Sequence, residues 1–104
     1  MKFNRLEQLV IAWAAARGIL TQSTPTAQLT KTFEEVGEIG DALEAGDRLA
    51  LIDGIGDTLV TLIIIAAMEN IRVEDCLTAA YIQIKDRKGH MINGVFVKES
   101  DLEA

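Results

Sequence analysis

The chain has 104 residues, 16 of them acidic and 10 basic, which gives a formal net charge of −6. This length suits one domain over residues 1–104, and an apolar content of 49% with a single proline excludes a disordered chain. The acidic balance argues against nucleic-acid binding, because the phosphate backbone is bound by clustered lysine and arginine side chains. An acidic protein that handles phosphate groups therefore needs a cation between itself and its ligand.

The cysteine and hydropathy patterns predict a compartment. Cys76 is the sole cysteine, so no internal disulfide forms, and we expect a small buried thiol in a reducing environment. No basic-then-apolar leader opens the chain, and the longest unbroken apolar run, Leu62 to Met68, is far shorter than the ~20 residues that span a bilayer. These features predict a soluble, cytoplasmic protein with no membrane partner.

Two helices are predicted in the first half of the chain. Over residues 3–17 apolar side chains recur at helical spacing, and a polar loop over 21–24 follows. Thr24 and Pro25 are a typical cap and first-turn pair. The second helix is therefore expected over about 25–44, with an apolar stripe on one side and acids on the other.

A third helix, over about 48–69, is expected to follow a cap at Asp47. Its apolar residues lie on every side, which is typical of a buried helix. In so short a chain, this pattern indicates that a second subunit covers part of it. The β-branched run over 63–65 also suits a strand, but the apolar segment is too long for one strand and lacks turn residues.

The last part of the chain predicts a fourth helix over about 73–87, with Tyr81 on its packing face. The dipeptide Asn93-Gly94 is a turn signal, and residues 95–97 favour a short strand. The polar tail over 99–104 is expected to be frayed.

Two pairs of acids have the spacing of a metal site. Glu35 and Glu38 are three residues apart, and Asp53 and Asp57 are four apart, so each pair shares a helical face. The two helices are joined by a short loop and will pack antiparallel, which can bring the four carboxylates together. Oxygen ligands without histidine or cysteine select Mg²⁺, with Mn²⁺ as the alternative, over zinc.

A plainer interpretation exists for each pair. The glutamates suit the solvated face of an amphipathic helix. The face of Asp53 and Asp57 is continued by Val60 and Ile64, which should be buried, so these acids need a partner. A lysine or arginine partner would satisfy them as well as a metal, although Arg48, the nearest in sequence, lies at the start of the helix. Spacing alone leaves both interpretations open.

The segment Lys31-Thr-Phe-Glu-Glu-Val-Gly-Glu-Ile resembles the Glu-Glu-x-x-Glu signature of MazG-like pyrophosphohydrolases. Asp53-Gly-Ile-Gly-Asp57-Thr-Leu-Val is similar to the second acidic motif of that family. The segment from Lys85 to Lys98 looks like the ending of compact members often carried by bacteriophages. The resemblance runs from about Leu29 to Lys98.

The resemblance implies an all-α fold of the NTP pyrophosphatase type, with a four-helix core that forms homodimers or homotetramers. It implies Mg²⁺ held by Glu35, Glu38 and Asp57. The second motif commonly has its first acid at the position of Gly54, and we expect Asp53, one residue earlier, to replace it as a ligand. Ile82 is a further departure, because similar proteins often have asparagine there.

The implied reaction is hydrolysis of nucleoside triphosphates, including deoxynucleotides, to the monophosphate and pyrophosphate. Glu34 or Glu38 would accept the proton of the attacking water. The predicted substrate contacts are Trp13, Lys31, Lys85 and Arg87. Two of these assignments have alternatives. Trp13 also suits a core or an interface, and the pair Lys85 and Arg87 also suits a solvated helix end that complements the dipole.

Other functions were weighed against this hydrolase. A di-iron carboxylate bundle needs two Glu-x-x-His motifs. This chain has a single histidine, His90, which lies in no such motif. A non-catalytic helical dimer, acting as an adaptor or as a nucleotide-binding regulator, remains the alternative. It predicts no turnover.

Overall fold

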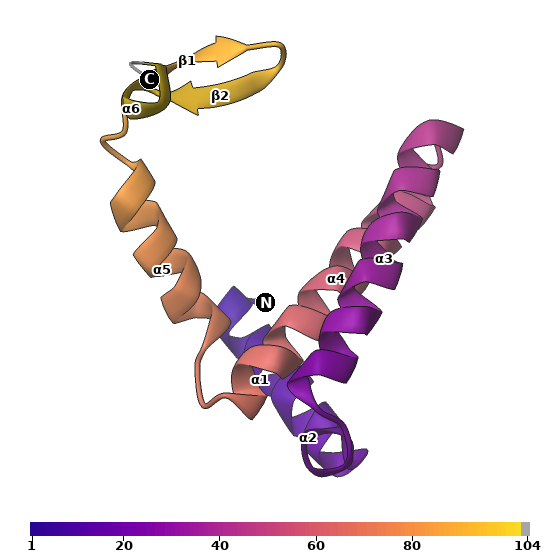
Figure 1. Cartoon of the computed structure of the whole chain (residues 1–104). Helices are drawn as coiled ribbons and strands as arrows, with labels where there is room; N and C mark the ends of the chain where they lie inside the picture. Colours follow the sequence, from indigo (N-terminus) through magenta and orange to yellow (C-terminus); the bar gives the residue numbers. More distant parts are fainter. Residues whose placement is uncertain (103–104) are drawn as a thin grey trace. The chain divides into compact units, whose positions relative to one another are not determined.

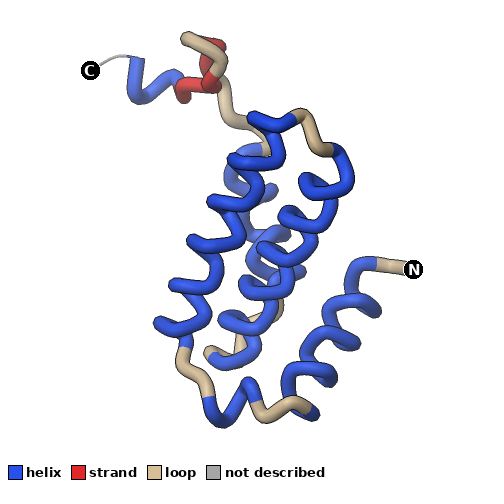
Figure 2. The backbone as a smooth tube through the Cα atoms, turned by 90° about the vertical axis from the view of Figure 1, so that its right-hand side faces the viewer, coloured by secondary structure: helices blue, strands red, loops and turns tan. Residues whose placement is uncertain are grey.

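The computed structural model describes residues 1–102 and divides the chain into two compact units, Met1–Glu74 and Asp75–Ala104. Helices make up most of it, and the strands, red in Figure 2, lie near the C-terminus. The predicted all-α class with a short C-terminal turn and strand is confirmed. In chain order the elements are α1 (Phe3–Ala16), α2 (Ile19–Gln22), α3 (Pro25–Ala45), α4 (Arg48–Met68), α5 (Val73–Ile84), β1 (Gly89–Ile92), β2 (Val95–Lys98) and α6 (Glu99–Leu102).

The helices α3 and α4 lie side by side and form the centre of the first unit (Figure 1). Their ends follow the predicted caps. The Thr24 hydroxyl accepts a hydrogen bond from the Ala27 amide, and the Asp47 carboxylate accepts one from the Ala50 amide, both at 3.1 Å. Between the helices Gly46 adopts a left-handed conformation, with φ of 66°, which reverses the chain. Local sequence therefore determines where both helices begin and end.

Two contacts set the register between α3 and α4. The hydroxyls of Thr32 and Thr61 form a buried hydrogen bond of 2.8 Å across the pair. Seven residues further along α3, and seven residues back along α4, Gly54 packs against Ile39, where a Cβ on the glycine would lie 3.1 Å from Ile39 Cγ1. Because the helices are antiparallel, each step forward on α3 corresponds to one step back on α4.

A buried carboxylate ties α1 to the start of α5. Glu7 is 1% exposed, and its carboxylate accepts hydrogen bonds from Arg72 Nη2 at 3.2 Å and from the Val73 amide at 2.7 Å. Val73 is the first residue of α5, so Glu7 satisfies a helix-end amide from another helix. The sequence analysis missed this role, because a single acid on a helix carries no local sign of a distant partner.

Within the single chain only part of α4 is buried, so its burial on every side, which was expected to need a second subunit, stays a prediction. Ile63 and Ile64 are buried, but several large apolar side chains of this helix are exposed, because α1 and α3 cover only part of its circumference. The exposed ones are Leu49, Ile52, Ile55, Leu59 and Leu62.

By length and composition α4 also resembles a membrane span. Its mean hydropathy is 2.0, and 28% of the apolar window is buried within the chain. One such helix is weak evidence, since the core helix of a soluble protein has the same properties. Asp53 and Asp57 lie within the helix, and a carboxylate near the centre of a bilayer costs about 2.5–3.5 kcal/mol.

The second unit is a small hairpin with α6 beside it. The strands β1 and β2 pair antiparallel, and the predicted turn at Asn93-Gly94 is confirmed, with φ of 50° and 82°. Within this unit α6 packs on the hairpin, and no element covers α5. Tyr81 and Cys76, which we expected to be buried, are therefore exposed.

The sequence analysis also missed three short elements. The helix α2 lies partly in the predicted polar loop, and α6 lies in the tail that was expected to be frayed. The strand β1 lies between the end of the predicted fourth helix and the predicted turn, where no element was expected. Each is four residues long, which is too short to show a hydrophobic period.

Candidate metal centre

Three carboxylates from the two central helices come together in the first unit. One oxygen from each of Glu35, Glu38 and Asp57 lies within 4.8 Å of the other two. Glu35 and Glu38 are one turn apart on α3. The antiparallel register set at Thr32 and Thr61 brings Asp57 to the level of Glu35. Three negative groups this close repel one another, so the arrangement favours a cation or bound protons.

Glu35 is the innermost of the three. It is 6% exposed, and Lys31 Nζ lies 3.4 Å from its Oε1. Its second oxygen, Oε2, is buried and receives no hydrogen bond within residues 1–102. A buried carboxylate oxygen without a donor is costly. The residues therefore fit a hard divalent cation, which would supply the missing positive charge through oxygen ligands.

The pKa shifts show how this crowding affects the site. The pKa of Glu38 is raised above its ordinary value of 4.5, chiefly because protonated Glu38 hydrogen-bonds to Glu35 and also because the two charges repel. Partial burial raises the pKa of Asp57 above 3.8, and the negative charges of Asp53 and Glu35 add to this shift. Both shifts mean that Glu38 and Asp57 bind protons more readily than isolated carboxylates do, because the cluster favours added positive charge.

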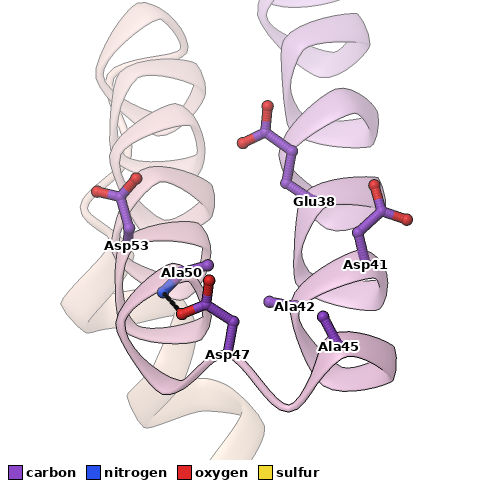
Figure 3. Close-up of a pocket in the computed structure, with 7 residues that line it drawn as sticks. All are labelled: Glu38, Asp41, Ala42, Ala45, Asp47, Ala50 and Asp53. Carbon is purple, nitrogen blue, oxygen red and sulfur yellow. Dashed lines mark hydrogen bonds between the residues drawn. The ribbon is translucent and has the colours of Figure 1, made fainter.

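Asp53 lies outside these three carboxylates. Together with Glu38, Asp41 and Asp47 it lines an adjoining open cavity of about 340 Å³ between the same two helices. Figure 3 shows the carboxylates of Glu38 and Asp53 coming from α3 and α4, while Asp47 is engaged as the cap of α4. Glu38 therefore belongs to both groups of acids, and the negative charge of Asp53 acts on Asp57 of the first group.

Gly54 stands where the second acidic motif commonly has its first acid, and the structure shows what surrounds it. It is buried against α3, with the place of a Cβ 3.1 Å from Ile39 Cγ1 and 3.5 Å from the Ile39 amide nitrogen. A side chain at this position would need Ile39 to shift by a few tenths of an ångström.

A second cavity, of about 500 Å³, opens beside the three carboxylates. Lys31, Glu35 and Asp57 line it, and so does Trp13, whose ring lies 5.8 Å from the Arg17 guanidinium carbon. The other lining residues are Ile19, Ala27, Gln28, Val60, Thr61 and Ile64. The sequence analysis named Trp13 and Lys31 and missed Gln28, because nothing local distinguishes it from other helix-surface glutamines.

The remaining predicted site residues are not among the three clustered carboxylates. Glu34 is exposed and pairs with Lys31 at 3.4 Å. The hydrogen bonds that Lys31 donates to Glu34 and then to Glu35 raise the pKa of Lys31 above 10.5. Lys85 and Arg87 follow α5 in the second unit. Ile82, the departure noted on α5, is exposed.

Comparison with known proteins identifies the family. The MazG nucleotide pyrophosphohydrolase domain matches residues 23–92, which include α3, α4 and all three clustered carboxylates. The chain therefore belongs to the MazG nucleotide pyrophosphohydrolase family, whose members depend on a divalent metal.

One curated relative is an uncharacterized 18.2 kDa protein from the rep-hol intergenic region of Haemophilus phage HP1. It is 34% identical over 59 residues, which are 57% of this chain and 36% of the relative. The matched part thus spans about a third of the length of that phage protein. No solved structure matches the chain.

Proposed function

We propose that this protein hydrolyses nucleoside triphosphates, including deoxynucleotides, to the monophosphate and pyrophosphate with Mg²⁺ as cofactor. The observation that carries the proposal is the cluster of Glu35, Glu38 and Asp57, with oxygens within 4.8 Å of one another inside the matched domain. The acidic surface supports it further, because a triphosphate needs a cation to approach a chain of net charge −6.

Glu35, Glu38 and Asp57 would hold the cation, which Mn²⁺ can replace, and Asp53 would contribute from the side of Glu38. When bound, Mg²⁺ supplies activation of the attacking water and neutralises phosphate charge. Glu35 suits the role of an anchor, since its buried Oε2 lacks a donor. Glu38 is exposed and can also accept a proton.

The other residues near the cluster have separate roles in this proposal. Lys31 pairs with Glu34 and Glu35 in the free protein, and on substrate binding its ammonium turns to a phosphate oxygen. That movement releases Glu34 to orient the attacking water. Trp13 lines the neighbouring cavity and offers a flat surface for the base. Lys85 and Arg87 are kept as proposed phosphate-binding residues on the ground of their sequence motif alone.

We also propose that the active form is a homodimer, or a homotetramer built from it, in the cytoplasm. The central pair of helices leaves large apolar side chains exposed on both members, and soluble monomers seldom expose so many together. On α3 these are Leu29, Phe33, Val36 and Leu43, and on α4 they are Leu49, Ile52, Ile55, Leu59 and Leu62.

The test is a panel of ribo- and deoxyribonucleoside triphosphates with Mg²⁺, measured as pyrophosphate release, with a chelator as the blank. We expect turnover with Mg²⁺ and none with the chelator. Glu38→Gln should lower kcat by about 100-fold or more, because it removes a ligand. Glu44→Gln, an exposed acid of the same helix, is the matched control and should keep normal turnover. Equal activity of the two variants would place Glu38 on a solvated face, and binding without turnover would favour a nucleotide-binding regulator.

A further inference from the structure

The cavity of about 500 Å³ beside the carboxylates has a charged end and an apolar end. Asp57 and Glu35 lie at one level of the helix pair, as the hydrogen bond between Thr32 and Thr61 requires. The same register brings Ile64 to the level of Gln28, two turns away. Ile19 and Ala27 line the cavity as well, near this apolar end. A cavity of this volume and mixed lining is typical of small-molecule sites.

The spacing along α3 matches the length of a nucleoside. Gln28 and Glu35 are seven residues apart on one face, which is about 10 Å at 1.5 Å per residue. A nucleotide whose 5′-phosphate lies at Glu35 and Asp57 therefore extends its base toward Gln28. Lys31, between the two, lies at the phosphate side.

The amide of Gln28 is held in a defined orientation at this place. Its Nε2 donates a hydrogen bond of 3.1 Å to the Ser23 hydroxyl, and the pair is partly buried. Ser23 lies at the end of α2, just before α3, so it holds Gln28 from the adjoining turn. One of the two amide N–H groups is engaged in this bond, and the Oε1 acceptor is left for a ligand in the cavity that Gln28 lines.

We propose that Gln28 selects the base by accepting a hydrogen bond from an exocyclic amino group, so that cytosine and adenine nucleotides are preferred over their 4-oxo and 6-oxo counterparts. The inference rests on the proposed function for the place of the phosphates. A carbonyl oxygen facing Oε1 would leave two acceptors opposed, which costs binding energy in a partly buried site. Ser23 is the positioning residue, since its hydroxyl accepts the hydrogen bond from Gln28 Nε2.

Two matched ligand pairs test this directly, because each differs only in the amino or oxo group. Calorimetric binding of CMP against UMP and of AMP against IMP, with Mg²⁺, measures base selection without any turnover. Pyrophosphate release from CTP, UTP, ATP and ITP measures it in the reaction. We expect the amino base of each pair to bind about tenfold more tightly, with the difference in KM rather than in kcat.

Substitution of Gln28 separates the role of its acceptor from its packing. Gln28→Leu should bring the affinity ratios of CMP to UMP and of AMP to IMP close to one. Gln28→Glu keeps an acceptor and should keep the preference for the amino bases. Ser23→Ala frees the amide to turn and should reduce the preference without removing it. Gln8→Leu, at an exposed glutamine of α1, is the control and should change neither ratio.

Two outcomes would overturn the inference. One is that the wild type binds CMP and UMP, and likewise AMP and IMP, with nearly equal affinity. The other is that Gln28→Leu lowers the affinity for all four ligands equally. Failure of the proposed function would look different. In that case no triphosphate would release pyrophosphate, while the monophosphate binding ratios would still report on Gln28.

Discussion

Glu38 links the two groups of acids between α3 and α4. It lies within 4.8 Å of Glu35 and Asp57, and it lines the adjoining cavity with Asp53. A single substitution therefore affects both groups, whereas Asp53 and Asp57 each belong to only one. These two aspartates lie four residues apart on one helix. The same substitution at each position therefore compares a carboxylate inside the cluster with one in the adjoining cavity.

The first prediction concerns that comparison. Asp57→Asn should lower kcat by about 100-fold and abolish Mg²⁺ affinity, because it removes a member of the cluster. Asp53→Asn should lower kcat by about tenfold only, because its carboxylate lies in the adjoining cavity, outside the three clustered carboxylates. Calorimetric Mg²⁺ titrations of both variants measure whether the two substitutions lower the Mg²⁺ affinity to different extents. Equal losses would make Asp53 a direct ligand, as the sequence comparison alone suggested.

The second prediction is a pH dependence of stability in metal-free buffer. The pKa values of Glu38 and Asp57 are raised in the folded protein, so the folded state binds these protons more tightly than the unfolded state. The stability that these bound protons contribute to the folded state is fully present below the ordinary pKa values, 4.5 for Glu38 and 3.8 for Asp57. It is lost as the pH rises through the raised pKa values. Melting temperatures of wild type and Glu38→Gln should therefore diverge above pH 4.5, in favour of the variant.

Mg²⁺ provides the control for this pH effect. Added at neutral pH, it should raise the melting temperature of the wild type and leave that of Glu38→Gln nearly unchanged, because a ligand stabilises only the folded state that binds it. Parallel pH profiles of the two proteins without metal would contradict the crowding of these carboxylates.

At the scale of elements, the Glu7 carboxylate connects α1 to the first residue of α5 by a hydrogen bond. Its carboxylate is 1% exposed and bridges the Arg72 guanidinium and the Val73 amide. Glu7→Ala should lower the free energy of unfolding by about 2–4 kcal/mol, because it leaves a charge and an amide without their partner. Glu69→Ala, at an exposed acid after α4, is the control. A loss below 1 kcal/mol in urea unfolding would show that water replaces Glu7 without cost.

The central helices α3 and α4 expose large apolar side chains that α1 and α2 leave uncovered. Ile52 and Leu62 are 59% and 40% exposed on α4, and Phe33 is 68% exposed on α3. We predict a stable dimer at micromolar concentration in sedimentation experiments, with Ile52→Glu or Phe33→Glu shifting it toward monomer or aggregate. Glu44→Gln should leave the dimer intact. A stable wild-type monomer would leave these side chains unexplained and contradict the proposed assembly.

The sequence alone determined the parts of the fold that depend on neighbours along the chain. Thr24 with Pro25 and Asp47 placed the starts of α3 and α4, and Gly46 placed the turn between them. The spacing of Glu35 and Glu38 put both on one face, and the two acidic motifs indicated the family that the comparison confirms. Caps, turns and helical spacing are local, so a few adjacent residues decide them.

Tertiary structure decided which of these residues meet. The contacts of Thr32 with Thr61 and of Gly54 with Ile39 set the axial register of α3 and α4, and that register joins Asp57 to Glu35 while it leaves Asp53 in the adjoining cavity. A one-residue shift would rotate each side chain by about 100° around its helix. The burial of Glu7 and the place of Gln28 in a cavity depend likewise on side chains distant in sequence, which no local pattern records.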